Sequence, residues 1–130
     1  MPIITKQDVT TRAGSAPGLE VSDLVDAAQG SQSLKIGELT MAPNTRVPRH
    51  IHPNTEEAMI ILEGTLDVVL GNQRMTVGPG HVVLAPAGTV HGFLNRTHQR
   101  GCCLSSRPSR SSGCSPASRE RQWVSPRSRA

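Results

Sequence analysis

The chain has 130 residues, a length that suits one compact domain. Apolar residues make up 35% of it and aromatic residues 2%, which is a low share for a packed core. The net charge of +4 hides two different segments: residues 1–95 carry 6 basic and 9 acidic side chains, whereas residues 96–130 carry 8 basic and 1 acidic. The basic excess belongs to the C-terminal segment, so it does not predict a nucleic-acid-binding body.

The residue pattern also gives no support for a membrane or secreted protein. The longest apolar run, Ala58 to Leu62, is far shorter than the roughly twenty residues of a membrane span, and the first residues lack the features of a secretory signal. The cysteines Cys102, Cys103 and Cys114 all lie near the C-terminus, so the body has no disulfide framework. We expect a cytoplasmic protein.

The elements expected along the body are short strands. Residues 1–33 form a weakly patterned, partly ordered arm, in which Leu19 to Ala28 fits either a short helix or a strand and a turn. Residues 34–95 have the spacing of an all-β sandwich or barrel, because short apolar runs alternate with Gly, Pro and Asn. Gly71-Asn72 predicts a two-residue hairpin turn. The apolar runs are Leu34–Met41, Ala58–Leu62, Leu66–Leu70, Met75–Val77 and Val82–Ala85.

Residues 96–130 differ in kind, since Ser and Arg fill 17 of the 35 positions. No periodicity is visible there beyond, at best, a strand from Gly101 to Leu104, and we expect a disordered tail. Three explanations of this segment compete. It could be the product of a shifted reading frame of GC-rich coding DNA, a genuine Arg/Ser-rich appendage that contacts nucleic acid or anionic surfaces, or a segment that binds a metal. The metal site would use Cys102, Cys103, Cys114 and His98, and it is the weakest of the three because no C-x-x-C pair is present.

Three of the body's histidines lie in a pattern that suits a metal centre. His50 and His52 alternate, so on an extended strand both imidazoles point to the same side. Glu57 opens the next apolar run, and His91 follows a Pro-Gly turn far along the chain. Such groups suit iron, manganese, nickel, zinc or copper, with two octahedral positions left open. The alternative is that the His-x-His pair is a surface feature, as we expect for the remaining body histidine, His81.

The spacing of these residues resembles the two motifs of the cupin superfamily. The segment that begins at His50-Ile51-His52 matches H-x-H-x(3,4)-E-x(6)-G through Glu57 and Gly64. The later segment matches G-x(5)-P-x-G-x(2)-H-x(3)-N through Gly80, Pro86, Gly88, His91 and Asn95. The resemblance covers residues 34–95 well, residues 1–33 loosely and residues 96–130 not at all.

One motif position departs from the family pattern. Cupins usually carry Gly six residues before the first motif histidine, where this chain has Asn44. Asparagine is the next most tolerant residue of a left-handed backbone, so we expect the turn to survive. We expect Asn95 to be a turn or strand-end residue and not a ligand.

The resemblance implies an antiparallel jelly-roll β-barrel, which would be incomplete at its C-terminal end if the tail adds no strand. It implies four metal ligands: His50, His52, Glu57 and His91. Glu56 competes with Glu57, because both spacings occur in the family. Glu57 is preferred because it lies six residues before Gly64 and shares strand parity with Met59 and Ile61.

The resemblance further implies an enzyme that uses a divalent transition metal on a small molecule. Dioxygenase, isomerase and decarboxylase chemistry all fit, with an oxidoreductase of the dioxygenase type foremost, in a pocket lined by Met59, Ile61 and Val83 with few polar groups. A non-catalytic small-ligand-binding or sensory cupin, and an inactive truncated product of a shifted frame, are the alternatives. No catalytic residue beyond the ligand set is evident.

We also expect a homodimer, with no specific nucleic-acid partner and no membrane partner. Residues 1–41 offer strands of the kind that cupins often pack across a partner, and an incomplete barrel would have open edges.

Overall fold

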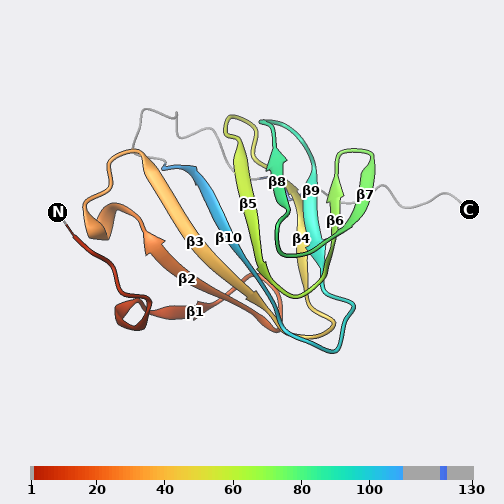
Figure 1. Ribbon diagram of the computed structural model, residues 1–130. Helices are drawn as coiled ribbons and strands as arrows, with labels where there is room; N and C mark the ends of the chain where they lie inside the picture. Colours follow the sequence, from red (N-terminus) through yellow and green to blue (C-terminus); the bar gives the residue numbers. More distant parts are fainter. Residues whose placement is uncertain (1, 110–120, 123–130) are drawn as a thin grey trace, which may run out of the picture.

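The computed structural model describes residues 2–109 and 121–122, which form two antiparallel sheets (Figure 1). The six-stranded sheet has the order β1-β2-β3-β10-β5-β8, and the five-stranded sheet has the order β11-β4-β9-β6-β7. The strands of the larger sheet are β1 (Thr11–Ala13), β2 (Leu19–Val25), β3 (Leu34–Met41), β10 (Gly101–Pro108), β5 (Glu57–Glu63) and β8 (Val82–Ala85). Those of the smaller sheet are β11 (Arg121–Gln122), β4 (Arg46–Ile51), β9 (His91–Leu94), β6 (Leu66–Leu70) and β7 (Gln73–Val77).

This architecture confirms the expected all-β, antiparallel jelly roll. Among the described residues, no hydrogen-bonded strand pair joins one sheet to the other, so the two sheets do not close into a barrel. The only helical elements in the described ranges are two single 3-10 turns, η1 (Lys6–Asp8) and η2 (Ala27–Gln29). No helix in this part of the chain therefore has the length and apolar character needed to cross a bilayer.

The apolar runs of the sequence become strands with close to the expected bounds. The runs Leu34–Met41, Leu66–Leu70 and Val82–Ala85 coincide with β3, β6 and β8. Gly71-Asn72 links β6 to β7, as a two-residue hairpin loop requires. The ambiguous stretch from Leu19 forms strand β2 followed by the 3-10 turn η2, so of the two readings the strand and turn is the right one.

The core lies between the two sheets and is built from residues that alternate along the strands. β5 contributes Met59 and Ile61, whereas β6 contributes Leu66 and Val68, and all four are at most 4% exposed. Phe93 of β9 packs in the same cluster. Each such side chain stabilises the fold by roughly 1.5–3 kcal/mol relative to an exposed position, so this layer fixes how the two sheets face each other.

The expectation that residues 96–130 form a disordered tail is wrong for the segment that includes β10. All eight β10 residues, Gly101–Pro108, pair with β3 in unbroken antiparallel register, and β10 pairs with β5 along its other edge. β10 therefore lies in the interior of the larger sheet, between two strands of the cupin-like body (Figure 1). Residues 110–120 and 123–130 of the expected tail lie outside the described residues.

Two sharp turns depend on residues that the sequence singled out. Asn44, between β3 and β4, has a φ of 60° and is the only described non-glycine residue with a positive φ, which confirms that asparagine replaces glycine there. Gly64, between β5 and β6, has a φ of 81°, and a Cβ added there would lie 2.6 Å from the carbonyl oxygen of Arg100. A side chain at Gly64 would therefore collide with the segment that leads into β10.

Asn95 does more than end a strand, because its buried side chain makes hydrogen bonds to three backbone carbonyl groups. Its side chain is fully buried, and Nδ2 donates to the carbonyl oxygens of Met41, Ala42 and Gln99 at 3.1, 3.3 and 2.8 Å. Its Oδ1 accepts hydrogen bonds from the backbone and hydroxyl of Thr97. Asn95 thus ties the end of β9 to β3 and to the loop before β10, and it is not part of the ligand cluster.

Candidate metal centre

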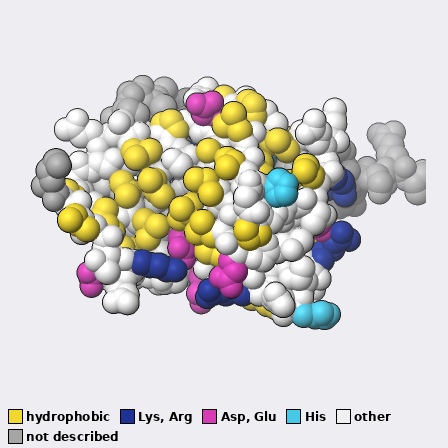
Figure 2. Space-filling view, viewed as in Figure 1, with side chains coloured by type: hydrophobic (Ala, Val, Ile, Leu, Met, Phe, Trp, Pro, Cys, Tyr) yellow, Lys and Arg dark blue, Asp and Glu magenta, His cyan; other side chains and the backbone are white. Residues whose placement is uncertain are grey.

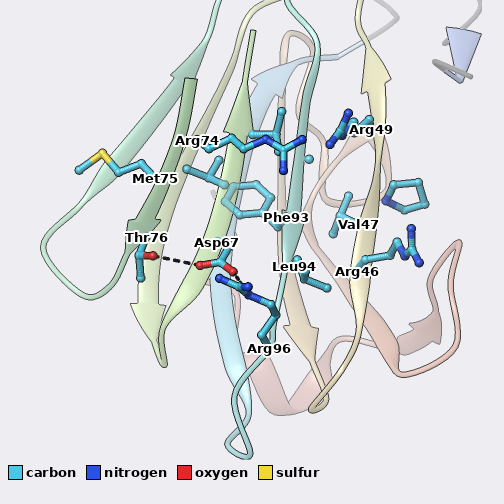
Figure 3. Close-up of a pocket in the computed structure, with 14 residues that line it drawn as sticks. Arg46, Val47, Arg49, Asp67, Arg74, Met75, Thr76, Phe93, Leu94 and Arg96 are labelled. Atoms are coloured by element: carbon cyan, nitrogen blue, oxygen red, sulfur yellow. Dashed lines mark hydrogen bonds and ion pairs between the residues drawn. The ribbon is translucent and has the colours of Figure 1, made fainter. Parts of the chain in front are cut away.

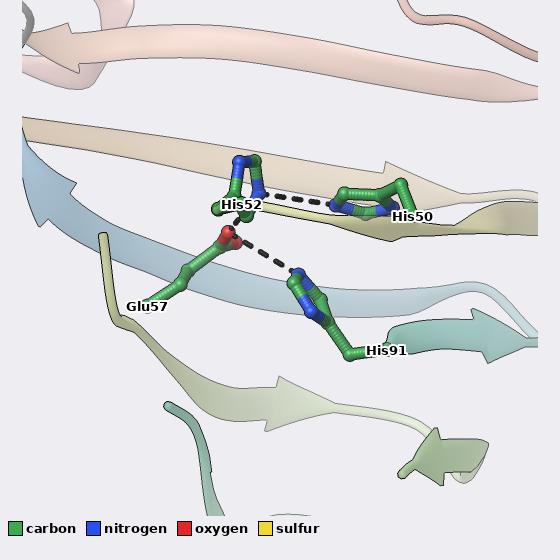
Figure 4. A group of neighbouring side chains, drawn as sticks. All are labelled: His50, His52, Glu57 and His91. Atoms are coloured by element: carbon green, nitrogen blue, oxygen red, sulfur yellow. Dashed lines mark hydrogen bonds and ion pairs between the residues drawn. The ribbon is translucent and has the colours of Figure 1, made fainter. Parts of the chain in front are cut away.

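Strands from both sheets bring the four expected ligands to one place (Figure 4). His50 lies near the end of β4 and His52 directly follows that strand, whereas Glu57 opens β5 and His91 opens β9. β4 and β9 pair in antiparallel register with His50 opposite His91, which sets two imidazoles side by side. The sequence prediction placed Glu57 and not Glu56 at this site, and Glu57 is buried there while Glu56 is exposed.

The ligand atoms of these four residues all lie within 4.8 Å of one another. His52 Nε2 is 2.8 Å from Glu57 Oε2 and 3.1 Å from His50 Nε2, and His91 Nε2 is 3.5 Å from Glu57 Oε2. His52, Glu57 and His91 are 6%, 8% and 2% exposed, and His50 is half-buried. Three imidazole nitrogens and one carboxylate oxygen thus share a small volume.

Two of the histidines are held in the tautomer that a metal requires. Nδ1 of His50 lies 2.7 Å from the carbonyl oxygen of Pro48, and Nδ1 of His91 lies 2.9 Å from that of Thr89. A carbonyl oxygen only accepts, so each Nδ1 carries the proton and each Nε2 presents a lone pair to the cluster. Fixing the distant nitrogen in this way is the usual support of a metal-binding histidine.

The atom that fits a metal best is Nε2 of His91. Among the described residues, it is the buried side-chain nitrogen or oxygen that has no hydrogen-bond partner. A buried polar atom left in this state costs about 1–3 kcal/mol, and a cation at the centre of the cluster would satisfy it. The donor set of three imidazoles and one carboxylate therefore fits a divalent transition metal.

The charges of the cluster are coupled through Glu57. Burial acts to raise the pKa of Glu57, but close contacts with the imidazoles of His52 and His91 and the hydrogen bond from Ser105 outweigh it and hold that pKa well below its usual range. Burial lowers the pKa of His50 below 6.5, and for His91 the hydrogen-bonding contact with Glu57 outweighs burial and raises the pKa. Glu57 is therefore ionised at neutral pH, and His50 is neutral.

A cavity of about 410 Å³ adjoins the cluster, and its lining differs from the expected one. Met59, Ile61 and Val83 belong to the buried core and do not line it. The cavity instead lies against β1, β2, β3, β4 and β10 and has charged walls. Its charged residues outside the ligand cluster are Arg12, Asp23, Lys35 and Arg107.

Arg12 and Asp23 were missed because they lie in the segment read as an arm, and Arg107 was missed because it lies in the segment read as a tail. For Lys35 a signal was available: within the run Leu34–Met41 it shares strand parity with Leu39 and Met41, so it points to the same side as two apolar residues that face the core. A charged residue at an inward position of a strand indicates a polar cavity. Arg107 had no such signal, because its strand was not predicted to extend past Leu104.

A larger cavity, of about 760 Å³, is separate from the ligand cluster (Figure 3). It lies along β4, β9, β6 and β7, and its charged lining residues are Arg46, Arg49, Asp67, Arg74 and Arg96. Asp67 accepts a hydrogen bond from Thr76 at 3.0 Å and forms an ion pair with Arg96. None of the four candidate ligands lines this cavity, so its size alone does not make it the active site.

The remaining candidates from the sequence lie away from any metal-like cluster. His81 is exposed as expected, and its Nδ1 lies 3.1 Å from the backbone of Gly78. Within the described ranges, the His50–His52–Glu57–His91 group is the one set of three or more potential ligands close enough to share an ion. Cys102 and Cys103 are buried in β10 and are not part of such a set, and Cys114 lies outside the described residues.

Comparison with known protein families tests the resemblance to cupins that the two histidine motifs indicated. The sequence profile of the cupin domain matches residues 37–106, more than half of the chain. The chain belongs to the cupin family. The match includes both histidine motifs and nearly all of β10, so the cupin domain extends beyond the expected boundary at residue 95.

Curated relatives of this cupin share only part of their length with it. The chain is 33% identical over 52 residues to a quercetin 2,3-dioxygenase of Bacillus subtilis, a match that covers 40% of this chain and 15% of the relative. It is 35% identical over 72 residues to germin-like protein 4-1 of rice, Oryza sativa subsp. japonica, covering 48% of this chain and 28% of the relative. The chain thus matches less than a third of the length of either protein.

Solved structures agree over most of the fold. The polyketide cyclase RemF of Streptomyces resistomycificus superposes with a TM-score of 0.74 at 28% identity, covering 83% of this chain and 79% of that one. A sugar phosphate isomerase of the cupin superfamily from Silicibacter pomeroyi gives a TM-score of 0.76 at 23% identity, covering 83% and 76%. At that identity the isomerase shows the shared fold alone.

Proposed function

We propose that this cupin is a metal-dependent enzyme that acts on a small organic molecule, with one divalent transition metal held by His50, His52, Glu57 and His91. The observation that carries this proposal is the convergence of four ligand atoms within 4.8 Å, among them the buried Nε2 of His91, which makes no hydrogen bond. The hydrogen bonds from His50 and His91 to backbone carbonyls support the same role, because they turn both lone pairs toward the centre.

A metal bound at this place would supply Lewis acidity or a binding position for oxygen, and four protein ligands leave octahedral positions for substrate. The residues of the chain supply the surroundings. Glu57 stays ionised in a buried position, and Ser105 orients it. The cavity beside the cluster gives a small molecule access from the His50 and His52 side.

Oxidative chemistry of the dioxygenase type is the reaction class that we propose first. The quercetin 2,3-dioxygenase among the curated relatives and the polyketide cyclase among the solved structures both bear names of enzymes with small organic substrates. Isomerisation and decarboxylation use the same kind of metal centre and follow as the next classes to assay.

The metal site is tested by elemental analysis of purified wild-type protein and of two neighbouring variants. Glu57→Gln should lose most of the metal, since an amide oxygen is a weaker ligand, whereas Glu56→Gln should keep it because Glu56 is exposed. The double variant His50→Ala/His52→Ala should also be free of metal. Equal metal content in wild type, Glu57→Gln and the double variant would overturn the proposal.

The activity is tested on metal-loaded protein with phenols and oxo acids, by following oxygen consumption and product formation. Metal-dependent turnover that is absent from Glu57→Gln supports an enzyme, and oxygen uptake supports the dioxygenase class. A chain that binds metal and small molecules without turnover would instead be a binding or sensory cupin, and the enzymatic part of the proposal would fail.

A further inference from the structure

Two cationic side chains lie opposite each other in the wall of the cavity beside the candidate metal centre. In the pairing of β10 with β3, Arg107 is in register with Lys35, and both line the cavity. Like charges directly opposite each other on neighbouring strands destabilise a sheet. The arrangement therefore favours a negative charge in the space that the two side chains share.

The nearby carboxylate of the protein is engaged mainly with a third cation. Asp23 accepts hydrogen bonds from Arg12 Nε at 2.8 Å and from Arg12 Nη2 at 3.2 Å, whereas Lys35 Nζ is 4.0 Å away. Among the described residues outside the ligand cluster, three cationic side chains and one carboxylate line the cavity. Its walls carry a net positive charge, to which a bound metal would add.

The contact between Arg107 and His52 indicates where an anion would lie. Arg107 Nη1 is 3.5 Å from His52 Nδ1. A guanidinium only donates, so Nδ1 of His52 is the acceptor in this contact. When His52 binds a metal through Nε2, its Nδ1 carries the proton instead, and this nitrogen and the guanidinium then both present N–H donors. An oxygen of an anionic ligand can accept from both groups while it remains next to the metal centre.

The space needed for such a ligand is kept open by a glycine. Gly37 of β3 lines the cavity and is in register with Asp23 on one side and with Ser105 on the other. A Cβ added at Gly37 would meet nothing closer than 3.7 Å, so the backbone there tolerates a side chain. The packing of the sheet therefore does not require glycine at position 37, and the absence of a side chain there leaves space between Asp23 and the metal centre.

We infer that this cavity selects a small organic anion, whose carboxylate or phosphate group is bound by Lys35 and Arg107 beside the candidate metal centre. The inference deepens the proposed function by naming the substrate class, and it rests on that function for the role of the metal. Arg12 then acts mainly through Asp23, and Gly37 provides the room for the ligand.

The test is calorimetric titration of the full chain, both loaded with Mn²⁺ and after removal of metal. The probes are acetate, malate, 2-oxoglutarate, glycerol 3-phosphate and inorganic phosphate, with glycerol as the neutral control. We expect at least one anion to bind, and its Kd to rise about tenfold or more in Lys35→Gln and in Arg107→Gln, which is the loss of one charge-assisted hydrogen bond. Comparison of the carboxylate probes with the phosphate probes shows which of the two anionic groups the cavity binds.

Three further variants keep this test sharp. Arg74→Gln, in the other cavity, removes an equal charge and should leave the anion affinity unchanged. Arg107→Lys should retain part of the affinity, and Gly37→Val should weaken anion binding while the metal content stays the same. Each variant is checked for metal by elemental analysis and for folding by circular dichroism.

The proposal of a metal site and the inference of an anion site can be refuted separately. If metal is absent but anions bind the chain in a manner that depends on Lys35 and Arg107, the cavity inference holds and the proposed metal function fails. If metal is bound but no anion of the panel binds, or glycerol binds as well as the anions, the inference is overturned. Unchanged affinity in Lys35→Gln and Arg107→Gln would overturn it as well.

Discussion

The hydroxyl of Ser105 donates a hydrogen bond of 2.7 Å to Oε1 of Glu57, so strand β10 orients the carboxylate of the candidate metal centre. The other carboxylate oxygen, Oε2, is the one that lies near His52 and His91. Ser105 thus leaves one oxygen of Glu57 directed at the imidazoles. A segment without motif residues therefore contributes directly to the geometry of the ligand set.

This relationship predicts that Ser105→Ala weakens metal binding. Loss of a hydrogen bond that orients a ligand typically costs about 10–100-fold in metal affinity, and we expect an effect in this range. The matched control is Ser106→Ala, since Ser106 is the next residue on β10 and pairs with Ala58 rather than with the core-facing Met59. Competition with a fluorescent chelator gives both affinities, and equal values for the two variants would contradict the prediction.

Truncation within the C-terminal segment should affect the whole fold. A chain that ends after Arg96 lacks β10 and leaves β3 and β5 without the strand that lies between them. We expect it to aggregate or unfold and to retain no metal, whereas a chain that ends after Ser109 should keep its metal because all four ligands and β10 are present. Circular dichroism and elemental analysis distinguish the two. Normal metal content in the shorter chain would show that β10 is dispensable.

The sequence predicted which four side chains come together, because each occupies a fixed position in one of the two spaced motifs. Strand parity put His50 and His52 on one side, and the distance to Gly64 chose Glu57 over Glu56. The core positions of β6 were predictable on similar grounds, since Leu66 and Val68 alternate with Asp67 and Val69, whereas β5 is a continuous apolar run in which only the structure shows which side is buried. Local periodicity was enough for the ligand set and for β6.

The second half of β10 escaped prediction because its inward positions face a polar cavity and not the core. Ser105 and Arg107 point toward Glu57 and the cavity, so the strand shows no alternation of apolar and polar residues. Its apolar residues, Cys102, Cys103 and Leu104, are consecutive and lie near the start of the strand, and both cysteines are buried. The strand is defined by its pairing with β3 and β5, and long-range pairing of this kind leaves no local signal.

Burial of the β10 cysteines gives a direct test of this strand. Burial raises the pKa of Cys103 to about 12, and burial likewise raises the pKa of Cys102. The thiolate is the reactive form, so neither residue should react with iodoacetamide at pH 8 until the chain is unfolded. Mass spectrometry of a Cys114→Ser variant, with and without denaturant, measures this. Rapid alkylation of the native variant would mean that residues 102 and 103 are exposed.

Metal affinity should fall as the pH drops below neutrality. The contact with Glu57 outweighs burial and raises the pKa of His91 above 6.5, so a proton competes with metal at His91 before it does so at His50, whose pKa is lowered by burial. In the metal-free chain the sign is opposite: protonated His91 stabilises the fold at low pH, and this contribution is lost as the pH rises through its raised pKa. Chelator competition and thermal melts at several pH values follow the two effects. Metal affinity that is independent of pH between 5 and 8 would contradict this coupling.

The outward face of β5 and β8 is where we expect a second copy of the chain to bind. Ile60, Leu62, Val82 and Leu84 are 39%, 45%, 62% and 53% exposed on neighbouring strands, and Ile60 pairs directly with Val82. Figure 2 shows apolar side chains gathered over the face formed by β3, β10, β5 and β8. An apolar patch of this kind can pack against the same patch of a second copy across a two-fold axis without leaving a charge unpaired. The homodimer stays a prediction, and this surface differs from residues 1–41 and the open edges, on which the sequence-based expectation rested.

Light scattering on the purified chain and on two lysine variants tests this dimer. Leu84→Lys places a charge within the proposed interface, and it should shift the protein to a monomer because a buried, unpaired ammonium group opposes association. Met75→Lys changes a side chain of nearly equal exposure, 55%, on β7 of the other sheet, and it should leave the dimer intact. A wild-type monomer at micromolar concentration would refute the dimer. A dimer that persists in Leu84→Lys would place the interface elsewhere, at the open edges of the sheets.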